Sequence, residues 1–287
     1  MAVIDHNHLT SRLPAMPDFA PGHVWLVGAG PGDPRLLSLL AMHALGAADI
    51  VVYDALVSPE VLALAGPNVV LEYAGKRGGK PSPKQRDISE RLIELSRKGL
   101  KVLRLKGGDP CLFGRGAEEA LALAAAGVPF RFVPGITAGI GGLAAAGIPM
   151  THRDVNSAVT FFTGHDAGGE LPDSIDWPAL VQGAPVLVLF MGLAHLGRIA
   201  EKLIASGLDA KTPAALISKA TTPEQRVVET ALGRAAADAA AAGLEPPCLI
   251  VIGDVVEFRA ALDPDASLES RARAAEVILK HARRIAG

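Results

Sequence analysis

The sequence contains few cysteines, few aromatic residues and no long apolar run. Two cysteines, Cys111 and Cys248, are too few for a disulfide framework or a cysteine-rich metal site, which favours a reducing compartment, and we expect the cytoplasm. No uninterrupted apolar stretch approaches the roughly 18 residues that a transmembrane helix needs. Residues 1–22 lack the basic start and apolar block of a secretory signal, so we predict that they form a flexible leader.

Neither sign of charge is in excess, and aromatic rings are scarce. The formal net charge is −2 and the isoelectric point is about 6.4, so the charge balance requires neither nucleic acid nor a membrane surface as a partner. Eight Phe, two Trp and two Tyr leave few rings for stacking on bases. Hydrophobic residues make up 49% of the chain, which excludes disorder, and 287 residues suffice for roughly two domains with cores of their own.

Glycine and proline, in contrast, are abundant, with 31 and 21 residues. In an ordered chain they belong in turns between regular elements. Over the first half, strands are predicted at residues 24–27, 50–53, 69–73, 101–105 and 130–133, with helices at 36–45, 59–65, 84–98 and 118–126. This alternation indicates an α/β domain with a largely parallel sheet, which we place at residues 23–134.

The second half predicts another α/β domain at residues 135–262. A glycine-rich helical stretch near residues 134–150 leads into it, and the charged residues 263–287 form a helical tail after it. Strands are predicted at residues 158–163, 185–191, 214–218, 226–230 and 249–253, with helices at 193–206 and 234–242. The expected fold class is therefore α/β, with two α/β domains.

The loop GAGPGDP follows the first predicted strand. A dinucleotide-binding loop needs three glycines at fixed positions, and Gly28 and Gly30 fit, but Asp33 stands at the third. Pro31 and Pro34 also remove two backbone N–H donors from a loop that would hold phosphate. An NAD site is disfavoured, and we interpret the loop as a stiff turn at the edge of the sheet where ligands bind.

Loops rich in glycine, proline and charge follow all five strands of the first domain. Parallel strands end at the same edge of a sheet, so these loops should line a ligand crevice there. Basic residues are concentrated in and near them: five lie between residues 76 and 86 with no acid among them, and Lys106, Arg115 and Arg153 lie in or near other edge loops. A single basic residue in such a loop is usually only solvated. The concentration of several basic residues in these loops, however, indicates an anionic substrate.

Asp54 directly follows the second predicted strand. It suits either a turn carboxylate or a general base, and the pattern leaves both open. His152 and His165 have no metal-ligand spacing, and Cys111 has no evident histidine partner, so no metal site is predicted.

Several long motifs together resemble the tetrapyrrole methyltransferase family. They are VWLVGAGPGDP (24–34), YDALVS (53–58), GKRGGKPSPKQRD (75–87), LKGGDPCLFGRG (105–116), VPGITA (133–138), GIPMTHRD (147–154), SAVTFFTGH (157–165) and PPCLIVIG (246–253). The resemblance covers roughly residues 23–262. It is strongest to the members that methylate uroporphyrinogen III.

The resemblance implies the class III methyltransferase fold, two α/β domains with a cofactor cleft between them. It implies transfer of two methyl groups from S-adenosylmethionine (SAM) to C2 and C7 of uroporphyrinogen III, giving precorrin-2 for cobalamin and sirohaem, with S-adenosylhomocysteine as the other product. The resemblance also implies a homodimer and no metal. Some relatives carry a fused dehydrogenase/chelatase module whose motifs are not seen here, so we expect this chain to catalyse methylation only.

Site residues follow from the same motifs. The family's proton acceptor falls on Asp54 and its proton donor on Lys76. SAM contacts are implied at Pro31, Gly107, Gly108, Asp109, Leu112, Thr137, Ala138, Met191 and Ala220. For the substrate carboxylates we expect the basic side chains of Arg77, Lys80, Lys106, Arg115 and Arg153.

Two departures and three alternatives remain. Cys111 stands where an aromatic residue is expected, and Ala117 replaces a glycine. The alternatives are a sibling methyltransferase acting on a later cobalamin intermediate or on an acceptor such as rRNA, an idle binding module, and an NAD enzyme. The motifs at residues 76–87 and 151–154 favour uroporphyrinogen, and the presence of Asp54 and the GGD loop argues against an idle module.

Overall fold

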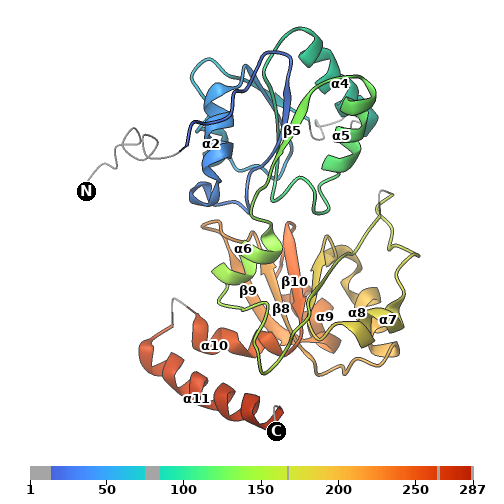
Figure 1. Ribbon diagram of the computed structural model, residues 1–287. Coiled ribbons are helices and arrows are strands. Elements are labelled where there is room, and N and C mark those ends of the chain that lie inside the picture. Colours follow the sequence, from blue (N-terminus) through green and yellow to red (C-terminus); the bar gives the residue numbers. More distant parts are fainter. Residues whose placement is uncertain (1–13, 75–84, 167, 264–265, 286–287) are drawn as a thin grey trace. The chain divides into compact units, whose positions relative to one another are not determined.

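The computed structural model describes residues 14–74, 85–166, 168–263 and 266–285 (Figure 1). The chain divides into two compact units. The first comprises Met1–Ala29 and Pro34–Gly135, and the second comprises Gly30–Asp33 and Ile136–Gly287. This division into compact units does not test the predicted domain limits, residues 23–134 and 135–262, which therefore stay a prediction.

The first unit is built on a parallel five-stranded sheet, in the order β3-β2-β4-β1-β5. The strands are β1 (Val24–Gly28), β2 (Ile50–Tyr53), β3 (Val70–Tyr73), β4 (Val102–Lys106) and β5 (Phe130–Val133). The central strands β1 and β4 are buried along their whole length, as expected for a parallel sheet covered on both faces.

Helices cover both faces of this sheet, and a separate hydrophobic core lies on each face. The elements are η1 (Pro34–Leu36), α2 (Leu39–Ala47), α3 (Pro59–Leu62), α4 (Gln85–Arg97) and α5 (Gly116–Ala125). Residues of α2 and α3 pack on one face with Trp25 and Leu105, and residues of α4 and α5 pack on the other with Leu26 and Val52. In Figure 1, α2 lies on the opposite side of the sheet from α4 and α5.

Side-chain caps explain where several helices begin. Ser38 accepts a hydrogen bond from the backbone N–H of Ala41 at 3.1 Å and so starts α2. Ser58 does the same for α3, where Pro59 supplies the fixed φ that suits a first helical position.

The second unit has a mixed five-stranded sheet, in the order β6-β7-β10-β8-β9. Its strands are β6 (Thr160–Thr163), β7 (Leu187–Phe190), β8 (Pro213–Ser218), β9 (Arg226–Ala231) and β10 (Cys248–Ile252). Only the β6–β7 pair is parallel, and the remaining pairs are antiparallel.

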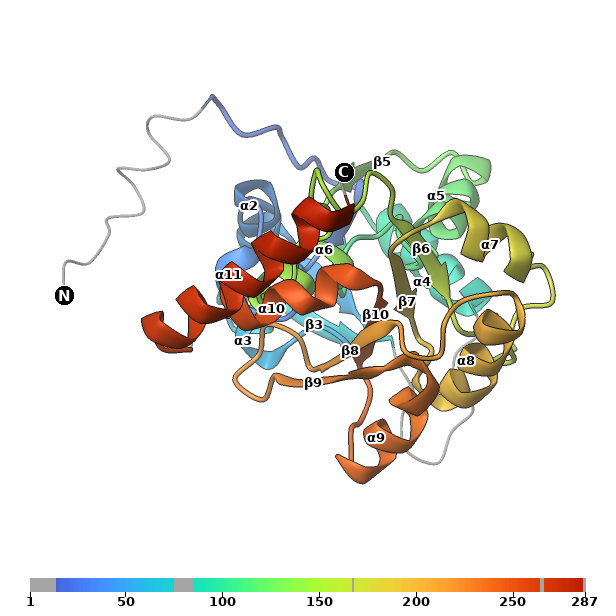
Figure 2. The ribbon, with the colours of Figure 1, turned by 90° about the horizontal axis from the view of Figure 1, so that it is seen from below.

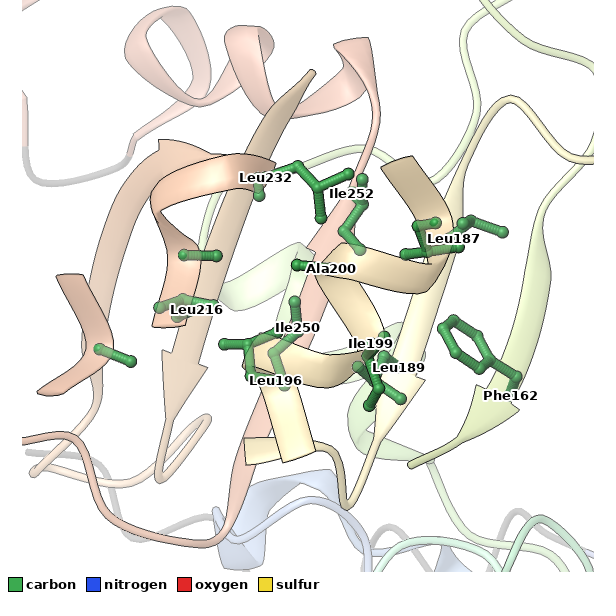
Figure 3. Close-up of a cluster of buried hydrophobic side chains, with 14 of the residues drawn as sticks. Phe162, Leu187, Leu189, Leu196, Ile199, Ala200, Leu216, Leu232, Ile250 and Ile252 are labelled. Carbon is green, nitrogen blue, oxygen red and sulfur yellow. The ribbon is translucent and has the colours of Figure 1, made fainter. Parts of the chain in front are cut away.

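Two cores lie on the two faces of this second sheet. One, shown in Figure 3, joins Leu216 and Ile250 to residues of α8 and α9, and the other joins Val188 and Val251 to α6 and η4. The elements are α6 (Ala138–Ala145), α7 (Trp177–Gly183), η2 (Leu193–His195), α8 (Leu196–Ala205), η3 (Leu232–Arg234), α9 (Ala235–Ala241) and η4 (Asp254–Phe258).

The chain ends in two helices that lie side by side, α10 (Arg259–Leu262) and α11 (Leu268–Ile285) (Figure 2). The guanidinium Nε of Arg271 donates to the carbonyl of Ala261 at 3.2 Å. In the described ranges no helix combines the length and apolar character needed to cross a bilayer.

The segment before β1 differs from the expected flexible leader. Phe19 is 2% exposed and stacks on Trp25 with ring centroids 4.5 Å apart. A ring buried in this way belongs to the core of the first unit, so the prediction of a loose leader was wrong at this residue.

Candidate active site

The carboxyl ends of the parallel strands in the first unit form one edge of its sheet, here called the carboxyl edge. The loops after β1, β2, β4 and β5 start there, and ligands of open α/β sheets bind at this edge. The fifth predicted loop, at residues 75–84, lies outside the described residues.

Three glycines bring the end of β1 and the loops after β4 and β5 into direct backbone contact. A Cβ placed on Gly28 would lie 2.5 Å from the carbonyl oxygen of Gly108 and 2.5 Å from the Cα of Gly135. A Cβ on Gly135 would overlap the same carbonyl oxygen. Since no real side chain tolerates such distances, glycine is required for this approach.

Asp109 ties two of these loops together. Its Oδ1 accepts from the N–H of Cys111 at 2.8 Å and its Oδ2 accepts from the N–H of Gly135 at 3.0 Å. Further along the same loop, Phe113 (φ 54°) and Arg115 (φ 58°) hold left-handed backbone conformations. Non-glycine residues of this kind cost free energy and gather at functional sites.

Asp54 starts the loop after β2 and faces two backbone donors. Its Oδ1 accepts from the N–H of Leu56 at 3.1 Å and from that of Gly107 at 3.4 Å, and 28% of its side chain is exposed. It is thus a turn carboxylate that also reaches solvent. A Cβ on Gly107 would lie 2.5 Å from the Cβ of Leu56, so glycine allows the loops after β2 and β4 to meet.

A buried cluster of charges lies behind Asp54. Glu119, in the first turn of α5, is fully buried, and its Oε1 accepts from Arg104 Nε at 3.1 Å, Lys106 Nζ at 3.2 Å and Gln85 Nε2 at 2.8 Å. Arg104 also reaches toward Asp54, with its terminal nitrogen 3.9 Å from Oδ2. Burial, and then the neighbouring Arg104, lower the pKa of Lys106 from its ordinary value.

Lys106 therefore needs a correction. We expected it in or near an edge loop, facing an anionic substrate, but it is the last residue of β4 and its side chain is 5% exposed. Its terminal nitrogen donates a hydrogen bond to Glu119 in the protein interior. The strand runs one residue further than predicted, which turns this side chain into the interior.

Residues of the second unit predicted to bind SAM gather around α6. A Cβ on Gly141 would lie 3.1 Å from Pro31 Cγ, and one on Gly142 would lie 2.8 Å from the Cβ of Ala220. The loop that contains Pro31 is fastened by the N–H of Asp33, which donates to Thr221 Oγ1 at 3.1 Å. Thr137 and Ala138 lie at the start of the same helix, and Thr137 is 7% exposed.

Met191, Arg115 and Arg153 lie at the protein surface. Met191 follows β7 with φ 53° and is 41% exposed. Arg115 is exposed and forms a two-bond ion pair with Glu118, at 2.9 and 2.6 Å, which raises the pKa of Arg115. Arg153 is exposed in the loop after α6. Leu112, the remaining predicted SAM contact, is half-buried in the loop after β4.

Lys76, Arg77 and Lys80 lie outside the described residues, so their predicted roles stay predictions. Within the described ranges, no group of three or more His, Cys, Asp or Glu side chains is arranged to hold a metal ion.

Sequence reasoning missed Arg104 and Glu119. A signal was present, because Arg104 interrupts an otherwise apolar strand (VLRL), and a charge in a buried strand needs a partner. Nothing in the sequence marked Glu119 rather than Glu118 as that partner, since the choice depends on which side of α5 faces the sheet.

Comparison with known proteins agrees with this architecture. The family model described as Tetrapyrrole (Corrin/Porphyrin) Methylases matches residues 23–236, which is more than half of the chain. The chain belongs to the tetrapyrrole methylase family. The resemblance read from the sequence motifs is thereby confirmed at the level of the family and its fold.

Individual tetrapyrrole methylases are similar over most of this chain. A Sinorhizobium protein named uroporphyrinogen-III C-methyltransferase is 60% identical over 91% of this chain and 93% of its own length. A Thermus thermophilus uroporphyrin-III C-methyltransferase structure, complexed with S-adenyl homocysteine, is 40% identical with a TM-score of 0.70, covering 82% of this chain and 98% of that one.

Longer relatives match over part of their length. The sirohaem synthase of Nitrosospira multiformis is 46% identical over 83% of this chain but only 50% of its own sequence. The chain therefore spans about half the length of that relative.

Proposed function

We propose that this chain transfers two methyl groups from SAM to C2 and C7 of uroporphyrinogen III, giving precorrin-2, the precursor of cobalamin and sirohaem. The observation that carries the proposal is the 60% identity to a uroporphyrinogen-III C-methyltransferase over 93% of that protein. The carboxyl edge, with its close backbone approaches and a solvent-reaching carboxylate, suits this chemistry.

SAM supplies an electrophilic methyl group when bound. The residues that would hold it are Pro31, Gly107, Gly108, Asp109, Leu112, Thr137, Ala138, Met191 and Ala220. They fit because a Cβ on Gly107 would occupy the space of the loop after β2, and because Asp109 already fixes the loop that would carry the cofactor. Most of these residues are small or uncharged, and the one charged side chain among them, Asp109, is a carboxylate that is already bound to two backbone N–H groups. S-adenosylhomocysteine is the product, and no metal takes part in the proposal.

The substrate is a polycarboxylate, with acetate and propionate groups on its rings. Arg153 is exposed and can pair with carboxylates, as Arg77 and Lys80 would from the loop after β3. Arg115 is also exposed, and it would bind a substrate carboxylate in exchange for its ion pair with Glu118. Lys106 supports the protein interior instead, because its ammonium group is buried against Glu119.

Methylation of a neutral ring carbon leaves a positive charge that is relieved by loss of a proton. Asp54 is the proposed acceptor, since its carboxylate reaches solvent at the carboxyl edge while two backbone N–H groups orient it. Lys76 is the proposed donor. A homodimer, which the family resemblance implies, and a location in the cytoplasm, which the few cysteines favour, complete the proposal.

The proposal is tested by incubating the protein with SAM and uroporphyrinogen III under anaerobic conditions and weighing the product by mass spectrometry. Two added methyl groups are expected. Coproporphyrinogen III, which lacks the acetate groups, serves as the matched substrate control and should be methylated more slowly. If uroporphyrinogen III gains no methyl group while a later corrin intermediate does, the chain is a sibling methyltransferase and the proposed substrate is wrong.

A further inference from the structure

The buried charges behind Asp54 form one connected chain of contacts. It runs from Glu119 Oε1 through the Nε of Arg104 (3.1 Å) and on to Asp54 Oδ2, which is 3.9 Å from the terminal nitrogen of the same guanidinium. One planar group thus faces two carboxylates. Its other terminal nitrogen donates to the carbonyls of Val52 and Leu105, both at 3.3 Å, so Arg104 is fixed from several sides.

The positions of these residues in the sheet explain the alignment. Val52 pairs with Arg104 in the register of β2 and β4, and Asp54 follows two residues after Val52. The guanidinium therefore lies beside the end of β2, where the loop that carries Asp54 begins. Since it is 3% exposed and an arginine keeps its charge, this contact is a permanent positive charge beside the carboxylate.

Glu119 holds the arginine in place and balances the cluster. Its Oε1 collects three donors, whereas its Oε2 has no hydrogen-bond partner although it is buried. Two carboxylates and two cations give no net charge. A buried cation without its counter-charge would be strongly unfavourable, so loss of Glu119 should disturb where Arg104 lies.

We infer that Arg104, held by Glu119, is a positioning residue for the reaction: it fixes the carboxylate of Asp54 at the carboxyl edge in the orientation that accepts a proton. This inference rests on the proposed function. A cluster that served only to attach α5 to the sheet would not need a guanidinium group directed at a partly exposed carboxylate.

The test is a double-mutant cycle on Arg104→Lys and Asp54→Asn. Lysine keeps the charge of the cluster but cannot face Glu119 and Asp54 with one planar group. Arg104→Lys should lower kcat roughly tenfold, because the ion pair that orients Asp54 is lost although the positive charge remains. The KM for both substrates and the affinity for S-adenosylhomocysteine should stay unchanged. Asp54→Asn should lower kcat roughly 100-fold. In the Asp54→Asn background, Arg104→Lys should cause no further loss.

Glu119→Gln is the second variant, because it removes the charge that holds Arg104 and keeps the size of the side chain. It should lower kcat in the wild-type background and have no effect in Asp54→Asn. Glu72→Gln is the matched control. Glu72 accepts two hydrogen bonds from Arg91 in the same unit, at 2.9 and 2.8 Å, so a carboxylate–guanidinium pair that is partly exposed and does not contact Asp54 is lost without a change in kcat.

The outcomes separate this inference from the proposed function. If the wild-type protein methylates uroporphyrinogen III and the losses from Arg104→Lys and Asp54→Asn multiply, the proposed function stands and the positioning role is overturned. If neither Arg104→Lys nor Glu119→Gln yields folded protein that binds S-adenosylhomocysteine, the cluster is structural and the inference fails. If the wild-type protein does not methylate uroporphyrinogen III, the proposed function fails and the inference fails with it.

Discussion

The two cysteines of this chain lie in different surroundings, and their thiols should behave differently. Cys111 is exposed in the loop after β4. Cys248 begins β10, is 8% exposed, and packs in the core that contains Leu216 and Ile250. Burial raises the pKa of the Cys248 thiol to about 11.

The raised pKa of Cys248 predicts a loss of stability at alkaline pH. Between its ordinary value of 9.0 and about 11, the thiol stays protonated in the folded protein but ionises in the unfolded chain. The folded state then binds more protons, so its free energy of unfolding falls as pH rises through this window, by about 2 kcal/mol for this group. Urea unfolding of wild type and Cys248→Ala at pH 8 and pH 11 measures the difference, and the variant should lose less stability.

Cys111→Ser is the matched control. Partial burial and then Asp109 raise the pKa of the Cys111 thiol as well, but this thiol is exposed, so solvent screening weakens its contribution to such linkage. The stability of this variant should fall between pH 8 and pH 11 about as far as that of the wild type. An equal fall in Cys248→Ala and wild type would contradict the role assigned to the buried thiol.

The location of a single residue was predictable from the sequence where its place relative to a predicted strand is enough to decide it. Asp54 was found because it follows a buried strand, and its turn geometry and exposure agree with both interpretations left open. Lys106 was misplaced, because a shift of one residue in a strand moves a side chain from a loop into the interior. Arg104 and Glu119 were missed, since their roles depend on contacts between β4 and α5.

At the scale of elements, the glycine loops of the carboxyl edge have the strictest backbone requirements. Gly28 at the end of β1, Gly108 in the loop after β4 and Gly135 in the loop after β5 meet without side chains between them. Asp109 adds a hydrogen bond from one of these loops to another. The loops therefore act as one assembly whose shape depends on the absence of Cβ atoms.

Gly135→Ala should disrupt this assembly. The new Cβ would overlap the carbonyl oxygen of Gly108 and approach the Cα of Gly28 at 2.7 Å, and backbone atoms cannot yield as a flexible side chain can. We expect a loss of about 3 kcal/mol in the free energy of unfolding and weaker binding of S-adenosylhomocysteine. Chemical denaturation and calorimetry measure the two effects.

Gly46→Ala provides a control of the same chemical change in the same unit. Gly46 lies in α2, and a Cβ there would meet no atom within 4 Å. Alanine is the better helix former, so this variant should gain roughly 0.5–1 kcal/mol in stability. Similar effects of Gly135→Ala and Gly46→Ala would show that the contact between the loops is less close than described.

Most elements were predictable because their local patterns agree with the fold. All ten predicted strands are present, with ends that differ from expectation by at most two residues. The apolar runs of the first unit are long enough to mark buried parallel strands. The antiparallel pairing of the second sheet could not be read in the same way, because β7 and β10 are also apolar over their whole length and β8 is apolar up to its last residue, Ser218.

At the scale of the whole molecule, each unit has its own sheet and its own cores. The chain has two tryptophans: Trp25 is buried in the first unit, and Trp177 begins α7 in the second, where it packs against Phe162 at 6.3 Å between ring centroids. The two units can therefore be followed separately by fluorescence.

Leu216→Ala should destabilise mainly the second unit. Leu216 is fully buried in the core shown in Figure 3, and such a truncation costs about 2–5 kcal/mol. In a Trp25→Phe background, where Trp177 is the reporter, the unfolding midpoint in urea should shift more than in a Trp177→Phe background, where Trp25 reports on the first unit. Equal shifts in the two backgrounds would show that the units unfold as one cooperative body.

The sequence by itself determined the α/β class, the order of the elements and the family, because apolar periodicity and long runs of glycine, proline and charge are local properties of the chain. Tertiary structure alone decided which charges are buried together and which loops touch. Arg104 meets Glu119 across 15 positions of sequence, and Gly28 meets Gly135 across a still longer interval. Contacts of this kind arise from the register of the strands and the packing of helices on the sheet, so no local pattern specifies them.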